Sequence, residues 1–142
     1  LGAYEPVANQ VSYSMTVRGV EREVVPACLQ YGVGITAFSP LAGGLLAGSK
    51  AANRPYSGTQ RWRGSADPAF SPEQLKIAEE LDRLGAEWGY QPSQLALAWL
   101  LARPAVVSAI VGPGRLETLE ESAAASDIEL SPEQLEKLDS LQ

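Results

Sequence analysis

The chain has 142 residues and 45% hydrophobic composition, so it can form one domain with a substantial core but is too short for a complete eight-stranded α/β barrel. Its 11 basic and 17 acidic residues give a net charge of −6, which disfavours nucleic acid and anionic membranes as partners. With no histidine and one cysteine, the sequence excludes a histidine-ligated metal site and a disulfide within the chain.

The sequence also bears on the setting of the protein. Cys28 lies in an apolar run, which is typical of a buried thiol rather than a nucleophile. There is no charged-then-apolar signal segment, and no apolar run approaches the ~20 residues that span a bilayer. We therefore expect a soluble, cytoplasmic protein, and the abrupt start at Leu1 leads us to expect a part of a larger fold.

The first half of the chain predicts two strands around a helix. Residues 7–14 alternate between apolar and polar side chains, which predicts a strand, and residues 18–30 then predict a helix. The short apolar run 35–39 predicts a buried strand. Residues 40–70 show no sustained period, which predicts a long loop of a kind that is usually functional or disordered.

The second half opens with two predicted helices. Ser71-Pro72-Glu73-Gln74 combines an N-cap serine, a proline at the first helical position and a glutamine that can complete a capping box. Gly89 should end this helix, and Pro92 opens a second one. Because residues 95–102 are apolar almost all round, we expect the second helix to be buried.

A third strand and two helices complete the chain. Residues 106–111 predict another buried strand, residues 116–125 predict a helix, and the capping pattern 131–134 starts a last helix. Strands that alternate with helices indicate parallel β/α units.

Each of the three predicted strands ends in a polar or glycine-rich segment: 10–13, 38–41 and 112–115. Ligands of α/β folds bind at the carboxyl ends of the strands. The third segment precedes a predicted helix, whose free N–H groups attract anions, and Arg115 adds a permanent positive charge. These segments together predict a phosphorylated ligand.

The predicted loop 40–70 favours the same ligand. It contains Lys50, Arg54, Arg61 and Arg63, and no acidic residue lies between positions 50 and 66. A positively charged loop on a negatively charged protein favours an anionic ligand.

Simpler interpretations stay open at this point. The run 43–50 resembles a phosphate-binding loop, but its final serine and lysine stand in the wrong order, and no G-x-G-x-x-G motif indicates a Rossmann site. Gly112-Pro113-Gly114 can be only a turn, Phe38 alone fits a core residue better than a cofactor platform, and the arginines can form a solvated surface. The residues alone predict an anion-binding α/β domain.

The order of these segments resembles a known family. The runs 9–14 and 32–48 resemble the aldo-keto reductases around their sixth and seventh barrel strands. The run 92–101 resembles the seventh helix of that family, and 110–122 resembles its eighth strand and cofactor loop. The resemblance covers nearly the whole chain and is nearest to the branch with potassium-channel β-subunits and similar bacterial oxidoreductases.

The resemblance implies a partial (β/α)8 TIM barrel of the α/β class, with about three parallel strands and four to five helices. Residues 1–142 would then be the C-terminal part of the barrel. They would comprise strands six to eight, a long loop at 40–70 and a C-terminal helix at 132–142.

The resemblance also implies an NADP(H) site. Gln10 matches the glutamine that binds the nicotinamide carboxamide, and Phe38 matches the aromatic residue that stacks on the ring. Further cofactor positions fall in three groups: Ser39, Pro40, Leu41 and Gly43 at the pyrophosphate; Gly112, Gly114, Arg115 and Thr118 near the 2′-phosphate; and Glu121 and Ser122 at the adenine. The family usually has asparagine at the last position.

The implied function is NADP(H)-dependent reduction of an aldehyde or ketone. In the family, an aspartate, a tyrosine, a lysine and a histidine of the N-terminal half carry the chemistry, and this chain contains none of their motifs. We expect no catalytic residue here, read Tyr13 as structural, and expect the chain by itself to be inactive. A non-catalytic nucleotide-sensing subunit and an inactive fragment are the alternatives, and self-association or pairing with the other half-barrel is expected.

Overall fold

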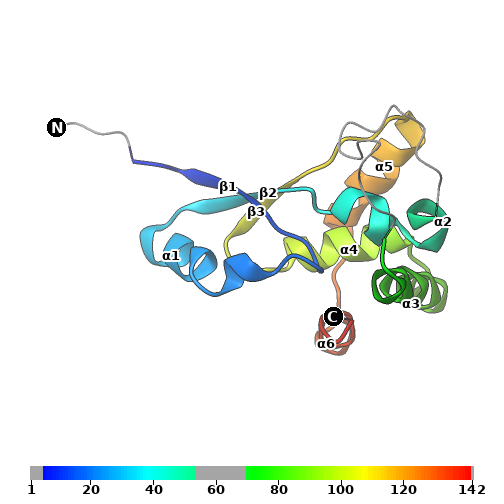
Figure 1. Cartoon of the computed structure of the whole chain (residues 1–142). Helices are drawn as coiled ribbons and strands as arrows, with labels where there is room; N and C mark the ends of the chain where they lie inside the picture. Colours follow the sequence, from blue (N-terminus) through cyan, green and yellow to red (C-terminus); the bar gives the residue numbers. More distant parts are fainter. Residues whose placement is uncertain (1–4, 54–69, 142) are drawn as a thin grey trace.

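A computed structural model describes residues 5–53 and 70–141 (Figure 1). Within these residues, the chain forms three β-strands, six α-helices and three 3₁₀ helices. Their order is β1 (Ala8–Ser12), η1 (Gly19–Glu21), α1 (Val24–Tyr31), β2 (Gly34–Phe38), η2 (Ala42–Ala47), α2 (Ser49–Ala52), α3 (Pro72–Trp88), α4 (Pro92–Leu101), β3 (Val106–Ile110), α5 (Leu116–Ala124), η3 (Ala125–Asp127) and α6 (Pro132–Asp139).

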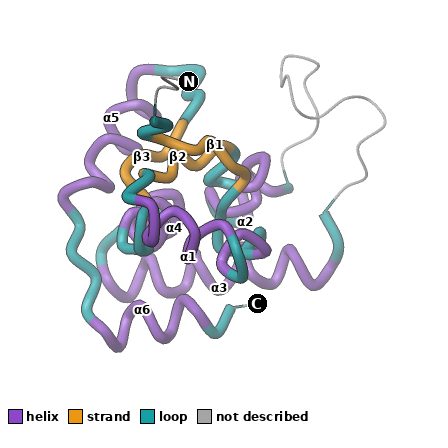
Figure 2. Tube along the Cα trace, turned by 90° about the vertical axis from the view of Figure 1, so that its left-hand side faces the viewer, coloured by secondary structure: helices purple, strands orange, loops and turns teal. Residues whose placement is uncertain are grey.

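The three strands form a parallel sheet in the order β1-β2-β3, as expected. One face of β2 carries Ile35 and Ala37, which are fully buried beneath the helices. Helix α1 packs on β2, and α4 packs on β3. In Figure 2, the sheet lies on one side of the molecule and most of the helices lie below it. The sheet therefore has one covered face and one face that no described helix covers.

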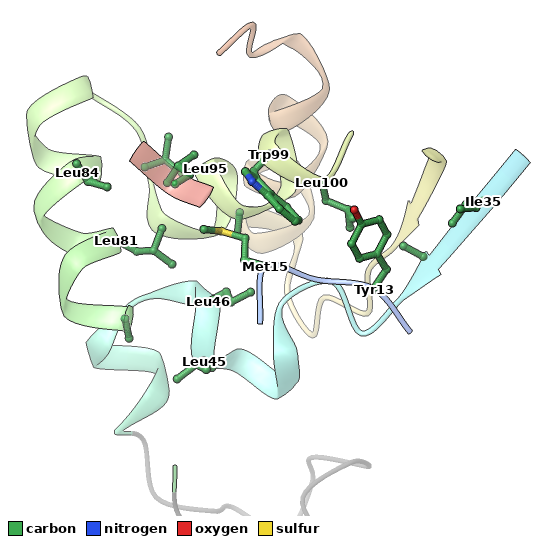
Figure 3. Close-up of a cluster of buried hydrophobic side chains, with 14 of the residues drawn as sticks. Tyr13, Met15, Ile35, Leu45, Leu46, Leu81, Leu84, Leu95, Trp99 and Leu100 are labelled. Atoms are coloured by element: carbon green, nitrogen blue, oxygen red, sulfur yellow. The ribbon is translucent and has the colours of Figure 1, made fainter. Parts of the chain in front are cut away.

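Helix α4 lies at the centre of the core (Figure 3), in agreement with its apolar sequence. Trp99 and Leu100 of this helix are fully buried, and they lie among apolar side chains from α3 and η2. The caps at the helix ends follow the sequence signals. Ser71 and Ser131 each accept a hydrogen bond from the glutamine three residues later, and Gly89 ends α3 in the left-handed conformation.

The predicted helix 18–30 is wrong in its first part, where the structure has η1 and a turn before α1 begins at Val24. Pro26 explains the late start, because proline has no N–H group and is tolerated only in the first turn of a helix. The predicted third buried strand is also wrong in part, since Val107 and Ile110 are 66% and 41% exposed. This strand lies at the edge of the described sheet, with helices on one face only.

The predicted loop 40–70 contains more structure than its sequence indicated. Residues 42–47 form η2 and residues 49–52 form α2, a single turn that was not expected, while Leu45 and Leu46 are fully buried. These elements are too short to show a period in the sequence. Residues 54–69, with three of the four basic residues of the predicted loop, lie outside the described residues.

None of the helices in the described ranges is long and apolar enough to cross a membrane. The same ranges contain no group of three or more histidine, cysteine, aspartate or glutamate residues that could hold a metal ion.

Candidate functional site

Because the three strands are parallel, their carboxyl ends lie at the same end of the sheet. Ser12 pairs with Phe38, and Phe38 pairs with Ile110. Gln10 pairs with Thr36, so Gln10 and Phe38 lie on the same face, because alternate residues of a strand point to the same side. This is the uncovered face, on which Gln10 is exposed and Phe38 is half-buried.

The segment after β2 has an unusual backbone. Ser39 and Ala42 have positive φ angles of 54° and 48°, and Gly43 follows with 67°. The N–H group of Ala42 donates to the carbonyl of Ser39 at 3.0 Å. Within the described residues, the N–H groups of Leu41 and Gly43 donate to no backbone acceptor. Successive N–H groups in such turns can bind an anion.

The start of α5 is a second place where backbone N–H groups have no side-chain cap from the N-cap residue. Arg115 is the N-cap residue, and its side chain makes no capping hydrogen bond to the first turn of α5, in contrast to the serine caps of α3 and α6. A Cβ atom at Gly112 or Gly114 would meet nothing within 4 Å, so packing in the described structure does not require these glycines. Arg115 is exposed at this helix end, where a positive charge and free N–H groups lie together.

The predicted adenine positions on α5 are held by other residues of the protein. Ser122 is buried, and its hydroxyl donates to the carbonyl of Thr118 at 2.8 Å. The hydroxyl of Ser93 donates to Oε1 of Glu121, and Nε2 of Gln94 donates to the carbonyl of Glu121 at 3.2 Å. No pattern in the sequence had marked Ser93 and Gln94 as site residues. Gln94 stands in a helix-start pattern, but nothing in the sequence links it to a residue 27 positions later.

Tyr13 lies apart from these donors, in the core. It is 1% exposed, its hydroxyl donates to Oε1 of Glu21 at 2.7 Å, and its ring meets that of Trp99 edge-on. Burial raises the pKa of Tyr13 well above its ordinary value, and the hydrogen bond to Glu21 and the negative charge of that carboxylate add to the shift. Tyr13 is therefore a weaker acid than an ordinary tyrosine.

A second network also escaped the sequence analysis, and it ties α6 to α4. Oδ1 of Asp139 accepts hydrogen bonds from Nη1 of Arg18 and from Nε1 of Trp99, both at 2.9 Å. The guanidinium groups of Arg18 and Arg103 lie 5.1 and 4.4 Å from the centre of a Trp99 ring. These contacts stabilise the fold at the end of the chain, and no site residue takes part in them.

Comparison with known proteins agrees with this architecture. The model of the aldo/keto reductase family matches residues 2–142. The chain is 38% identical over 135 residues to the "uncharacterized oxidoreductase YrpG" of Bacillus subtilis (strain 168), covering 95% of the chain and 40% of the relative. It is 32% identical over 142 residues to "probable aldo-keto reductase 1" of Glycine max, covering 96% of the chain and 40% of the relative.

A solved structure also matches the chain over part of its own length. The chain superposes with a TM-score of 0.67 and 30% identity on a thermostable aldo-keto reductase crystallised with the inhibitor epalrestat, covering 96% of the chain and 40% of that protein. The chain thus spans about two fifths of the length of these relatives. With a family model that matches almost every residue and three parallel strands covered by helices on one face, the chain belongs to the aldo/keto reductase family and has the fold of a partial (β/α)8 barrel.

Proposed function

We propose that this chain is the NADP(H)-binding part of an oxidoreductase that reduces aldehyde or ketone groups by hydride transfer. Membership of the aldo/keto reductase family supports oxidoreductase chemistry in general. The observation that carries the proposal is that Gln10 and Phe38 share the uncovered face of the sheet, and that the turn after Phe38 carries N–H groups without backbone acceptors in the described structure. The start of α5 lies beyond the carboxyl ends of the same strands (Figure 1).

The uncovered face of the sheet fits the nicotinamide end of the cofactor. Phe38 offers a partly exposed aromatic side chain on this face, as stacking on another ring requires. Gln10 offers an exposed amide on the neighbouring strand, and an amide can both donate to and accept from a carboxamide. We assign Phe38 to the ring and Gln10 to the carboxamide.

The turn after β2 fits a pyrophosphate. Its backbone turns through positive φ angles, and the N–H groups of Leu41 and Gly43 are without backbone acceptors in the described structure. Backbone donors of this kind bind phosphate oxygens without adding charge. We assign the segment Ser39, Pro40, Leu41 and Gly43 to the pyrophosphate.

The start of α5 fits a phosphate beside an adenosine. Free N–H groups and the guanidinium of Arg115 favour a dianionic group such as the 2′-phosphate that distinguishes NADP from NAD. We assign Gly112, Gly114, Arg115 and Thr118 to this phosphate. Glu121 and Ser122, on the next turn of the same helix, are assigned to the adenine.

When bound, NADPH supplies the hydride, and the residues of this chain bind and orient the cofactor. The chain contains no histidine, and the buried hydroxyl of Tyr13 is bound to Glu21. We propose that the group that donates the proton lies outside this chain and that the chain by itself is inactive. A cytoplasmic location stays a prediction from the sequence.

The proposal is tested by titrating the purified protein with NADPH and with NADH and following tryptophan fluorescence. We expect NADPH to bind more tightly than NADH. We also expect Arg115→Ala to weaken the binding of NADPH at least tenfold and to change the binding of NADH little, because only NADPH carries the 2′-phosphate. Arg83→Ala is the matched control, since Arg83 pairs with Glu80 and Glu87 on an exposed face of α3.

The outcomes separate the parts of the proposal. If the unmodified protein binds neither nucleotide, cofactor binding is refuted. If both nucleotides bind with equal affinity and Arg115→Ala changes neither affinity, the preference for NADP(H) is refuted, but a dinucleotide-binding site is still supported. Nucleotide binding without carbonyl reduction by any longer form of the protein would favour a nucleotide-sensing subunit.

A further inference from the structure

We infer that Ser93 and Gln94, at the start of α4, are positioning residues that hold Glu121 so that it selects a ligand base with an amino group. The inference rests on the proposed function, because it assumes that the adenosine end of a dinucleotide binds beside α5. It adds two residues of another helix, α4, to the adenine end of the proposed site.

Ser93 holds the carboxylate of Glu121 from within the core. Ser93 is only 4% exposed, and it is one of three buried polar residues in the described part of the chain. Its hydroxyl donates to Oε1 of Glu121, across 28 positions of sequence. A buried hydroxyl needs a partner, and this partner lies on the helix that begins at the candidate phosphate site.

Gln94 holds the backbone of the same residue. Its Oε1 accepts from the N–H of Gln91 at 3.0 Å, and its Nε2 donates to the carbonyl of Glu121 at 3.2 Å. Both ends of the amide are therefore used, which fixes the orientation of the side chain. Two adjacent residues of α4 thus bind the carboxylate and the carbonyl of one residue of α5.

This arrangement leaves one oxygen of Glu121 available to a ligand. Oε1 is engaged by Ser93, while Oε2 accepts no hydrogen bond from the described residues. The neighbouring hydroxyl of Ser122 donates within α5, to the carbonyl of Thr118. An ionised carboxylate only accepts hydrogen bonds, so Oε2 pairs with a donor such as the 6-amino group of adenine. The 6-carbonyl of hypoxanthine at the same place would be repelled.

The test compares NADPH with its hypoxanthine analogue, nicotinamide hypoxanthine dinucleotide phosphate in the reduced form. The readout is the ratio of the two dissociation constants, measured by fluorescence titration. A variant that is merely less stable weakens the binding of both ligands to the same extent and leaves this ratio unchanged. The ratio therefore separates positioning of Glu121 from a general loss of structure.

Ser93→Ala should lower the preference for NADPH about tenfold, because Glu121 is then free to rotate away from the base. Ser93→Thr keeps a hydroxyl and should restore most of the preference. Ser131→Ala is the control: it removes a serine that caps α6 and should cost stability, but it should leave the ratio unchanged.

Glu121→Gln gives a sharper result. The hydroxyl of Ser93 should hold the amide oxygen and turn the amino group toward the base, so that the variant prefers the hypoxanthine nucleotide. In the double variant Ser93→Ala/Glu121→Gln, the amide can turn either way, and the preference should disappear. If Ser93→Ala does not fold, Glu121→Gln alone decides, because a side chain that is not held would show no reversed preference.

The proposed function and the positioning role of Ser93 can be refuted separately. If the unmodified protein does not bind NADPH, the proposed function and this inference both fall. If it binds NADPH while Ser93→Ala keeps the unmodified ratio, only the positioning role is refuted.

Discussion

At the scale of single residues, the structure separates side chains that stabilise the core from side chains that are available to a ligand. Tyr13 follows β1 directly and stands close in sequence to Gln10, but its hydroxyl is bound to Glu21 and its ring is buried against Trp99. Gln10, three positions earlier, is exposed. The two residues therefore have different roles, although they belong to the same short segment.

Tyr13 makes the stability of the fold depend on pH in the alkaline range. In the unfolded chain its hydroxyl loses its proton near pH 10, whereas in the folded protein burial and Glu21 raise its pKa. The folded state thus keeps a proton that the unfolded state loses, so stability falls as the pH rises above about 10.

Tyr13→Phe tests this dependence. At pH 7 the variant should lose about 1 kcal/mol, because the hydrogen bond to Glu21 is absent, although Arg18 still pairs with Glu21 at 2.7 Å. Above pH 10 the difference from the unmodified protein should shrink. Free energies of unfolding in urea from pH 7 to pH 11 would show this, and a constant difference over that range would contradict the assignment.

At the scale of elements, a carboxylate of α3 holds the end of the segment that follows β2. Oδ2 of Asp82 accepts a hydrogen bond at 3.0 Å from the N–H of Ser49, the first residue of α2. Gly48, just before it, has φ 94° and ψ 167°, a conformation that side chains rarely adopt. The position of α2 therefore depends on a residue without a side chain at position 48.

Gly48→Ala should destabilise the protein by about 2–3 kcal/mol, because the new methyl group is strained and also meets the carboxylate of Asp82. Gly19→Ala is the matched control: a Cβ there meets nothing within 4 Å, so its effect should stay within about 0.5 kcal/mol. Urea denaturation measures both variants, and equal effects would disprove the role assigned to Gly48.

At the scale of the whole molecule, the described sheet has one uncovered face and two edges. Val7, Val107 and Ile110 are 83%, 66% and 41% exposed on and beside the edge strands. Unpaired strand edges with apolar side chains favour pairing with another chain. We propose that this chain associates with a second copy or with the other half of a barrel.

Sedimentation velocity over a range of protein concentrations tests this proposal for the chain by itself. We expect the sedimentation coefficient to rise with concentration, and Val107→Lys to reduce the rise, because a lysine on an edge strand opposes pairing. Glu136→Lys, at an exposed position on α6, controls for the added charge. A compact monomer at every concentration would contradict the proposal.

Much of the fold could be predicted from the sequence because its signals are local. The capping serines at 71 and 131 and the apolar runs of β2 and β3 lie within a few residues of the features that they specify. The order of strands and helices predicted parallel pairing, and the order of motifs identified the family and the candidate cofactor residues. The short elements η1, η2, α2 and η3 were missed, since each is too short to show a period.

Tertiary structure alone decided which distant side chains meet. The bonds from Ser93 to Glu121 and from Trp99 to Asp139 join residues 28 and 40 positions apart, and no local pattern marks either pair. The exposure of β3 could not be predicted from the sequence either, because an apolar run reads the same whether one or both faces of its sheet are covered. Burial and long-range hydrogen bonds depend on how elements pack in three dimensions, whereas caps and periods depend only on neighbours along the chain.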